Sequence, residues 1–150
     1  MQRFLNEVAI VTGAGNGIGK AAAQRLASEG ARVAVADLDQ TAAQQTAQAI
    51  AAAGGEAMAV TVDVTARPSV EDMVAAVLER YGQVDVLCNV AGIAVGEPFL
   101  QVTDENWRRT LDVNLTGVFL CSQVVARQMV EQGIAGRIVH MASTNGLVGN

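Results

Sequence analysis

The 150-residue chain is poor in aromatic and in basic side chains. Aromatic residues make up 3% of it while 51% of its residues are hydrophobic, so alanine, valine, isoleucine and leucine must fill the core. A core of small aliphatic side chains suits a parallel sheet with helices packed closely on it. Lys20 is the sole lysine, the net charge is −5 and no basic run occurs. The sequence therefore lacks the clustered positive charge that is typical of nucleic-acid-binding proteins.

The chain also lacks the signals of secretion, membrane insertion and metal binding. Its start, MQRFLNE, contains no signal-type apolar region, and no apolar stretch reaches the ~18 residues of a membrane span. Cys88 and Cys121 match no metal or redox spacing, so we expect buried free thiols, which favour a reducing compartment. We therefore expect a cytoplasmic protein without a metal site and without membrane contact.

Apolar runs and amphipathic segments alternate along the chain. The runs predict buried strands at 8–11, 31–36, 57–62, 84–88 and 136–141. The amphipathic segments predict helices at 17–29, 39–53, 68–81 and 103–132. This order predicts an α/β fold in which right-handed crossovers join five parallel strands into a doubly wound, Rossmann-like sheet.

Residues 103–132 predict one long helix. Thr103 is a suitable N-cap, and Asp104 and Glu105 favour the positive end of the helix dipole. Two largely apolar stripes run along it, one formed by Leu111, Leu115, Val118, Ser122, Val125 and Met129 and the other by Val113, Gly117, Leu120 and Val124. A helix that is apolar on two faces must bury both. One face is expected to cover the sheet and the other to meet a partner subunit, with a second contact inside the chain as the alternative.

A glycine-rich loop, TGAGNGIG at residues 12–19, separates the first predicted strand from the first helix. This position directs backbone N–H groups and the positive end of the helix toward a phosphate. Gly13 is expected to make the turn, while Gly17 and Gly19 permit close approach and close helix packing.

Two related phosphate-binding motifs are excluded by their spacing. The triphosphate loop, GxxxxGK[ST], fails at Ala14 and at Ala21. The usual dinucleotide pattern, GxGxxG, fails because Ile18 stands where its third glycine belongs. The spacing that fits is TGxxxGxG.

Asp37 at the end of the second strand predicts the choice of cofactor. It lies 18 positions after Gly19, where an acid can accept hydrogen bonds from the adenosine ribose. At about 5 Å and an effective dielectric constant near 20, each unit of charge on a 2′-phosphate would cost about 3 kcal/mol. The next residue is Leu38 rather than arginine, and Asn16 adds no cation. The sequence therefore predicts NAD over NADP.

At this point the residues resemble the classical short-chain dehydrogenase/reductase family. The loop at 12–19 looks like its glycine motif, and Asp63-Val64 is similar to its adenine-contacting pair. Asn89-Val90-Ala91-Gly92 looks like its NNAG motif, with valine replacing the second asparagine; the backbone turn is expected to survive. Asn114 matches the asparagine, and Ser143 the serine, of its catalytic tetrad.

The resemblance implies an oxidoreductase that transfers a hydride between NAD and a small secondary alcohol or ketone. Ser143 would orient the substrate oxygen, and Asn114 would hold a water in a proton relay. The implied cofactor-binding residues are Gly13, Asn16, Gly17, Ile18, Gly19, Asp37, Leu38, Asp63, Val64, Asn89, Ala91 and Gly92. It also implies a homo-oligomer, a dimer or homotetramer, assembled through the 103–132 helix. His140, out of phase with Ser143, is expected to be structural or at the substrate rim.

The resemblance also predicts that residues 1–150 are a dinucleotide-binding domain truncated before the family's catalytic tyrosine and lysine. Tyr81 ends a helix far upstream and Lys20 belongs to the glycine helix, so neither is expected to substitute. The family's C-terminal strands and helices would be absent as well, and the fragment alone is expected to be inactive. The alternative is a non-catalytic dinucleotide-binding sensor or scaffold module.

Overall fold

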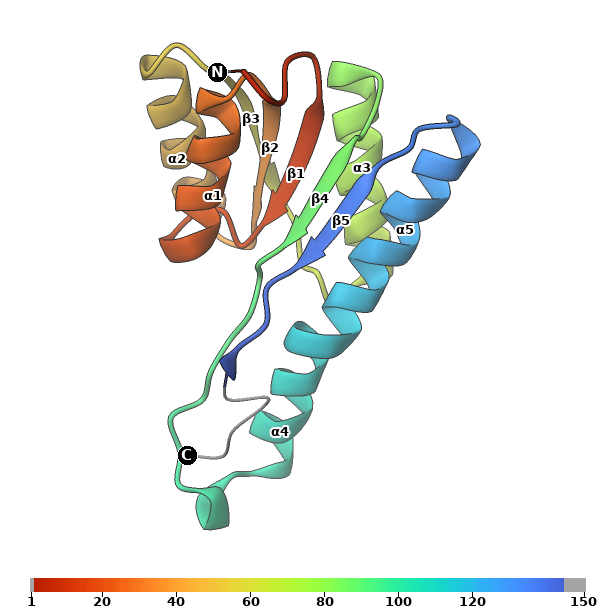
Figure 1. Ribbon diagram of the computed structural model, residues 1–150. Helices are drawn as coiled ribbons and strands as arrows, with labels where there is room; N and C mark the ends of the chain where they lie inside the picture. Colours follow the sequence, from red (N-terminus) through yellow and green to blue (C-terminus); the bar gives the residue numbers. More distant parts are fainter. Residues whose placement is uncertain (1, 145–150) are drawn as a thin grey trace.

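The structure is a computed structural model that describes residues 2–144. Its five strands form one parallel sheet in the order β3-β2-β1-β4-β5 (Figure 1). The strands are β1 (Val8–Thr12), β2 (Arg32–Asp37), β3 (Glu56–Thr61), β4 (Val86–Asn89) and β5 (Arg137–His140). The chain runs outward from β1 to β3, then returns to the other side of β1 for β4 and β5. The predicted doubly wound, Rossmann-like sheet is confirmed.

Helices cover both faces of the sheet, α1 and α2 on one and α3 and α5 on the other (Figure 1). They are α1 (Gly17–Ser28), α2 (Gln40–Ala52), α3 (Arg67–Tyr81), α4 (Asp104–Leu111) and α5 (Gly117–Glu131), with a 3₁₀ turn, η1 (Phe99–Gln101), and a π-helical turn, η2 (Asp112–Thr116). None of the helices in residues 2–144 is long and apolar enough to cross a membrane.

Two aliphatic cores lie on the two faces of the sheet. Successive side chains of a strand point to opposite faces, and all five residues of β1 are buried. Val8 and Ile10 pack with side chains of α3 and α5, whereas Ala9 and Val11 pack with side chains of α1 and α2. The strand that was predicted to be buried on both faces is therefore the centre of both cores.

The predicted 103–132 helix is formed by α4, η2 and α5 in succession. Thr103 caps it as predicted, since its Oγ1 accepts a hydrogen bond from the N–H of Asn106 at 3.1 Å. The stripe that contains Val113 is buried at Gly117 and Leu120. The stripe that begins at Leu111 is buried only near its end, at Val125 and Met129. Leu111 and Leu115, in its first half, are 37% and 64% exposed. One face covers the sheet, and the contact of the other stays a prediction.

Both cysteines are free thiols, but they differ in burial. Cys121 is fully buried, as predicted, and burial raises the pKa of its thiol to about 11. Cys88 is only half-buried, which corrects the expectation for that residue, and burial raises its pKa as well. It lies in β4 beside Val139 of β5, which is 53% exposed.

A buried carboxylate ties the N-terminal residues to the end of α1. Glu29 is 5% exposed and accepts hydrogen bonds from two arginines. Arg3 contacts both of its oxygens, with Nη2 at 2.6 Å from Oε1, and Arg25 Nε lies 2.5 Å from Oε1. The hydrogen bond from Arg3 is the main reason why the pKa of Glu29 falls from 4.5 to about 2.

This cluster predicts a pH-dependent contribution to stability. A carboxyl group whose pKa is lowered by folding stabilises the protein above its unfolded pKa, and the effect disappears as the pH falls toward the folded value. The stability difference between the wild type and Glu29→Gln should therefore be full at neutral pH and shrink between about pH 4.5 and 2. Urea unfolding at several pH values measures it. Glu131→Gln, an exposed change at the end of α5, is the control, and a difference independent of pH would contradict the assignment.

Candidate functional site

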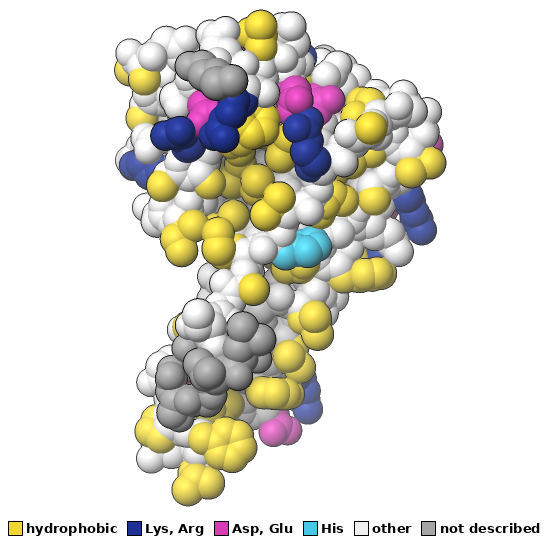
Figure 2. Space-filling view, in the orientation of Figure 1, with side chains coloured by type: hydrophobic (Ala, Val, Ile, Leu, Met, Phe, Trp, Pro, Cys, Tyr) yellow, Lys and Arg dark blue, Asp and Glu magenta, His cyan; other side chains and the backbone are white. Residues whose placement is uncertain are grey.

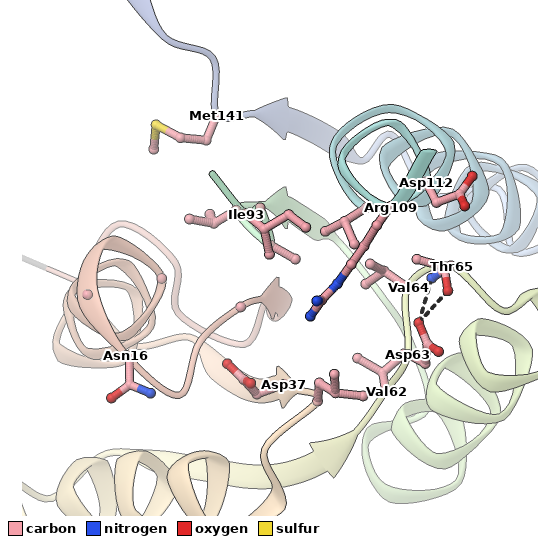
Figure 3. Close-up of a pocket in the computed structure, with 18 of the residues that line it drawn as sticks. Asn16, Asp37, Val62, Asp63, Val64, Thr65, Ile93, Arg109, Asp112 and Met141 are labelled. Atoms are coloured by element: carbon pink, nitrogen blue, oxygen red, sulfur yellow. Dashed lines mark hydrogen bonds between the residues drawn. The ribbon is translucent and has the colours of Figure 1, made fainter. Parts of the chain in front are cut away.

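A cavity of about 1010 Å³ opens at the carboxyl ends of the strands, as expected for an open parallel sheet (Figure 3). Its walls come from the glycine loop, the ends of β2, β3 and β4, and one face of α4 and η2. The lining residues are Gly13, Asn16, Gly17, Ile18, Gly19, Asp37, Leu38, Val62, Asp63, Val64, Thr65, Val90, Ala91, Gly92, Ile93, Glu105, Arg108, Arg109, Asp112, Val113 and Met141. All of the predicted cofactor-binding residues except Asn89 are among them.

Glycines are needed in the loop because its backbone packs very closely. A Cβ on Gly13 would lie 2.8 Å from the Cα of Ala91, and one on Gly19 would lie 2.1 Å from the carbonyl oxygen of Gly13. Gly17 differs, since a Cβ there would meet nothing within 4 Å and its φ is +52°. Two of the glycines therefore permit the packing of the loop, and Gly17 leaves its outer surface open to a ligand.

The amino end of α1 fits an anionic ligand. The N-cap residue, Asn16, makes no side-chain capping bond, and the first turn contains no acidic residue. By contrast, Asp39 caps α2 and Thr103 caps α4. An uncapped helix end beside a bare glycine presents N–H groups and the positive helix dipole, which match the pyrophosphate of a dinucleotide.

Two side chains hold the loop at Gly15. Its N–H donates to Oδ2 of Asp37 at 2.8 Å, and its carbonyl accepts from the hydroxyl of Thr46 at 3.1 Å. Thr46 lies in α2 and is fully buried. The other oxygen of Asp37 accepts from the N–H of Asp39 at 3.0 Å, which fixes the carboxylate at the cavity wall. Thr46 is not among the predicted residues, because its only signal in the sequence is a hydroxyl within the alanine-rich face of a helix.

Asp63 is held in a similar way beyond the end of β3. Its Oδ1 accepts hydrogen bonds from the N–H and from the hydroxyl of Thr65, at 2.9 and 2.7 Å (dashed in Figure 3). Its own N–H donates to the hydroxyl of Ser69 at 3.0 Å. Asp63 and the neighbouring Val64 both line the cavity, and their predicted contact with an adenine stays a prediction.

Two side chains fix the segment that follows β4. Oγ1 of Thr12 accepts from the N–H groups of Val90 and Ala91, at 3.1 and 3.2 Å. Asn114, in η2, accepts from the N–H of Ile93 and donates to its carbonyl, both at 2.8 Å. Residues 90–93 form no regular turn, so the expected turn stays a prediction, but these two side chains hold the segment in spite of the valine at position 90. The side chain of Asn114 acts as a clamp on this segment, and its part in a proton relay stays a prediction.

Asn89 contacts other parts of the fold rather than the cavity. It is buried, and its Nδ2 lies 3.0 Å from the hydroxyl of Ser122 and 3.1 Å from Nδ1 of His140. Ser122 donates its own proton to the carbonyl of Val118, so it accepts from Asn89. An amide nitrogen only donates, so in this arrangement Nδ1 of His140, on the exposed β5 edge (cyan in Figure 2), is the acceptor. The side chain of Asn89 is thus engaged away from the cavity, and its contact with a cofactor stays a prediction.

The predicted catalytic serine lies near the cavity, whereas the sole tyrosine lies at the opposite edge of the sheet. Ser143 follows β5 on the surface, two positions after Met141, which lines the cavity. Tyr81 ends α3, is 7% exposed and lies between the guanidinium groups of Arg32 and Arg80, each 5.4 Å from the ring centre. Burial raises the pKa of Tyr81. Because Arg32 begins β2, this ring lies at the amino edge of the sheet, opposite the cavity.

One face of the long helix lines the cavity, although no motif marked it. Its members, Glu105, Arg108, Arg109, Asp112 and Val113, follow helical spacing. Helical spacing predicts that these residues share one face of the helix, but it does not indicate that this face meets a ligand. Within residues 2–144, no group of three or more side chains could hold a metal ion.

A sequence model of the family described as short chain dehydrogenase matches residues 7–150. The chain belongs to this family. A 3-oxoacyl-[acyl-carrier-protein] reductase of Synechocystis sp. is 41% identical over 100% of this chain and 61% of the reductase. An L-rhamnose 1-dehydrogenase (NAD(P)(+)) of Azotobacter vinelandii is 42% identical over 97% of this chain and 59% of that enzyme.

The fold agrees with the family as well. The crystal structure of a short-chain type dehydrogenase/reductase from Mycobacterium marinum matches with a TM-score of 0.95 at 39% identity, over 98% of this chain and 60% of that one. The chain thus spans about 60% of the length of the proteins it matches. It has the fold of an oxidoreductase family that uses a nicotinamide dinucleotide.

Thr46 yields a prediction about the glycine loop. Thr46→Val keeps the volume of the side chain but leaves the carbonyl of Gly15 without its partner, and an unpaired buried group costs about 1–3 kcal/mol. We expect a loss of stability of this size in urea unfolding and weaker dinucleotide binding in calorimetry. Thr46→Ser keeps the hydroxyl and should keep the binding. Equal loss of binding in both variants would contradict the role of the hydrogen bond.

Proposed function

We propose that the chain carries the cofactor site of an NAD-dependent oxidoreductase. The enzyme would transfer a hydride between the nicotinamide and a secondary alcohol or carbonyl substrate, such as a sugar, a polyol or a 3-oxoacyl compound. The observation that carries the proposal is the cavity at the carboxyl ends of the strands. It unites the uncapped amino end of α1 with the carboxylates of Asp37 and Asp63 and the clamped segment before Ile93.

The residues of the cavity fit the parts of a dinucleotide in order. The N–H groups around Gly17 and Ile18 would bind the pyrophosphate, Asp37 the ribose hydroxyls, and Asp63 with Val64 the adenine. The bound cofactor would supply the hydride acceptor or donor. Ser143 would orient the substrate oxygen, and Asn114 would keep the Ile93 segment in place beside the cofactor.

The charge at Asp37 supports NAD rather than NADP. Both of its oxygens accept backbone hydrogen bonds, which hold the carboxylate where a 2′-phosphate would lie. Leu38, which follows it, is 70% exposed and supplies no positive charge. The name of the rhamnose relative includes both cofactors, so the preference is a property of this site rather than of the family.

We also propose that the protein is a cytoplasmic homo-oligomer, a dimer or homotetramer, assembled through the long helix. Leu111, Leu115 and Phe119 repeat every four residues across η2 and are 37%, 64% and 53% exposed. Such a repeat of large apolar side chains forms one continuous stripe, which a second helix can cover.

The cofactor preference is tested by removing the charge of Asp37 without removing its hydrogen bond. Asp37→Asn still offers an oxygen to the N–H of Gly15. We expect the wild type to bind NAD over a hundredfold more tightly than NADP, and the variant to discriminate less than about tenfold. Titration of both cofactors measures this, with Asp72→Asn on α3 as a charge-matched control. Equal affinity of the wild type for the two cofactors would refute the proposal.

Turnover by the 150-residue chain gives a second test. Its sole tyrosine, Tyr81, is buried at the opposite edge of the sheet, so a general acid of the family type is not available within residues 2–144. Loss of a general acid/base typically costs about 10²–10⁴ in rate. We expect the chain to bind NAD but to form no appreciable NADH in the presence of secondary alcohols. The absorbance of NADH measures this. Oxidation at a normal enzymatic rate would contradict this expectation.

A further inference from the structure

Arg109 extends from α4 into the cavity. Figure 3 shows its guanidinium directed toward the end of the cavity where Asp37 and Val62 lie. The position follows from helical spacing, because Arg109 is one turn from Glu105 and one turn from Val113, which line the same wall. A long cationic side chain therefore extends from the helix into the cavity, toward the ends of β2 and β3.

The guanidinium has no partner in the described part of the chain. Its neighbour Arg108 forms an ion pair with Asp104 at 3.4 Å, whereas Arg109 makes no hydrogen bond, ion pair or ring contact within residues 2–144. Asp37 and Asp63 line the same cavity but accept from backbone N–H groups instead. A cation directed into a cavity, with acids nearby that are already engaged, is available to a ligand.

The surroundings of the guanidinium indicate which part of a ligand it meets. Val62 lines that end of the cavity, and Leu38 and Val64 follow the same two strands; these side chains offer aliphatic surface rather than hydrogen-bond acceptors. A flat ring with apolar faces and polar edges suits such walls, with Asp63 at one edge. The planar guanidinium of arginine stacks on ring faces, which the ammonium of lysine does not do.

We propose that Arg109 binds the adenine of the cofactor by stacking its guanidinium on the face of the ring. The proposal rests on the proposed dinucleotide function and adds a binding residue from α4, outside the motifs of the strand ends. Arg109 thereby holds the adenosine half and contributes nothing to the nicotinamide half. A salt link from Arg109 to a cofactor phosphate is the competing arrangement.

Calorimetry of the 150-residue chain with four ligands tests the proposal. The ligands are NAD, ADP-ribose, AMP and nicotinamide mononucleotide, and the variants are Arg109→Ala and Arg109→Lys. Arg127→Ala, which replaces an exposed arginine of α5 outside the cavity, is the matched control. Because Arg109 is exposed and unpaired, the variants should keep the thermal midpoint of the wild type, and this is measured in parallel.

Arg109→Ala is expected to weaken NAD, ADP-ribose and AMP by the same factor, roughly 5- to 30-fold, and to leave nicotinamide mononucleotide unchanged. Arg109→Lys should bind these ligands as weakly as the alanine variant does, because lysine keeps the positive charge but lacks the planar guanidinium. Recovery of binding by lysine, with a loss of affinity at high salt, would show a phosphate contact and overturn the proposal. Unchanged AMP binding in Arg109→Ala would overturn it too. Failure of the wild type to bind NAD would refute the proposed function itself.

Discussion

The hydrogen bonds to Gly15 position the whole phosphate end of the cavity. Asp37 reaches it from the end of β2, and Thr46 reaches it from within α2, so the loop is attached to the strand-helix unit that follows it. The N–H of Ala14 adds a bond to the carbonyl of Ala36 at 3.1 Å. With the loop fixed there, the close contact between Gly13 and Gly19 sets the direction of α1. The helix end can then meet a phosphate without any side chain of its own.

Asp37 consequently has two functions that share one carboxylate. It supports the loop through the N–H of Gly15, and in the proposed function its charge disfavours a 2′-phosphate. A change of cofactor preference at this position would disturb the loop unless the new side chain still accepts that bond. The same constraint would apply at Asp63, where the bonds from Thr65 hold the carboxylate at the cavity wall. In the proposed function, recognition and support are therefore coupled at both acids.

Features encoded by local pattern were predictable, and features that depend on distant partners were not. The all-apolar run of β1 and the spacing of the glycine loop identified the central strand and the phosphate end without tertiary information. The orientation of Asn89 depends on Ser122 and His140, which lie 33 and 51 positions away, so a four-residue motif could not reveal it. Arg109 is an exposed helical residue. Its position in the cavity depends on where α4 packs, which the sequence pattern does not reveal.

The π-helical turn explains how one helix serves both the cavity and the core. Its inward residues recur every four positions, from Glu105 at the cavity through Gly117 to Met129 in the core. In an α-helix of 3.6 residues per turn, such a stripe would rotate steadily away from the sheet. The wider turn at η2 takes up an additional residue and offsets part of this rotation. Asn114 lies within this turn, so the irregularity that keeps α5 packed also places the clamp on Ile93.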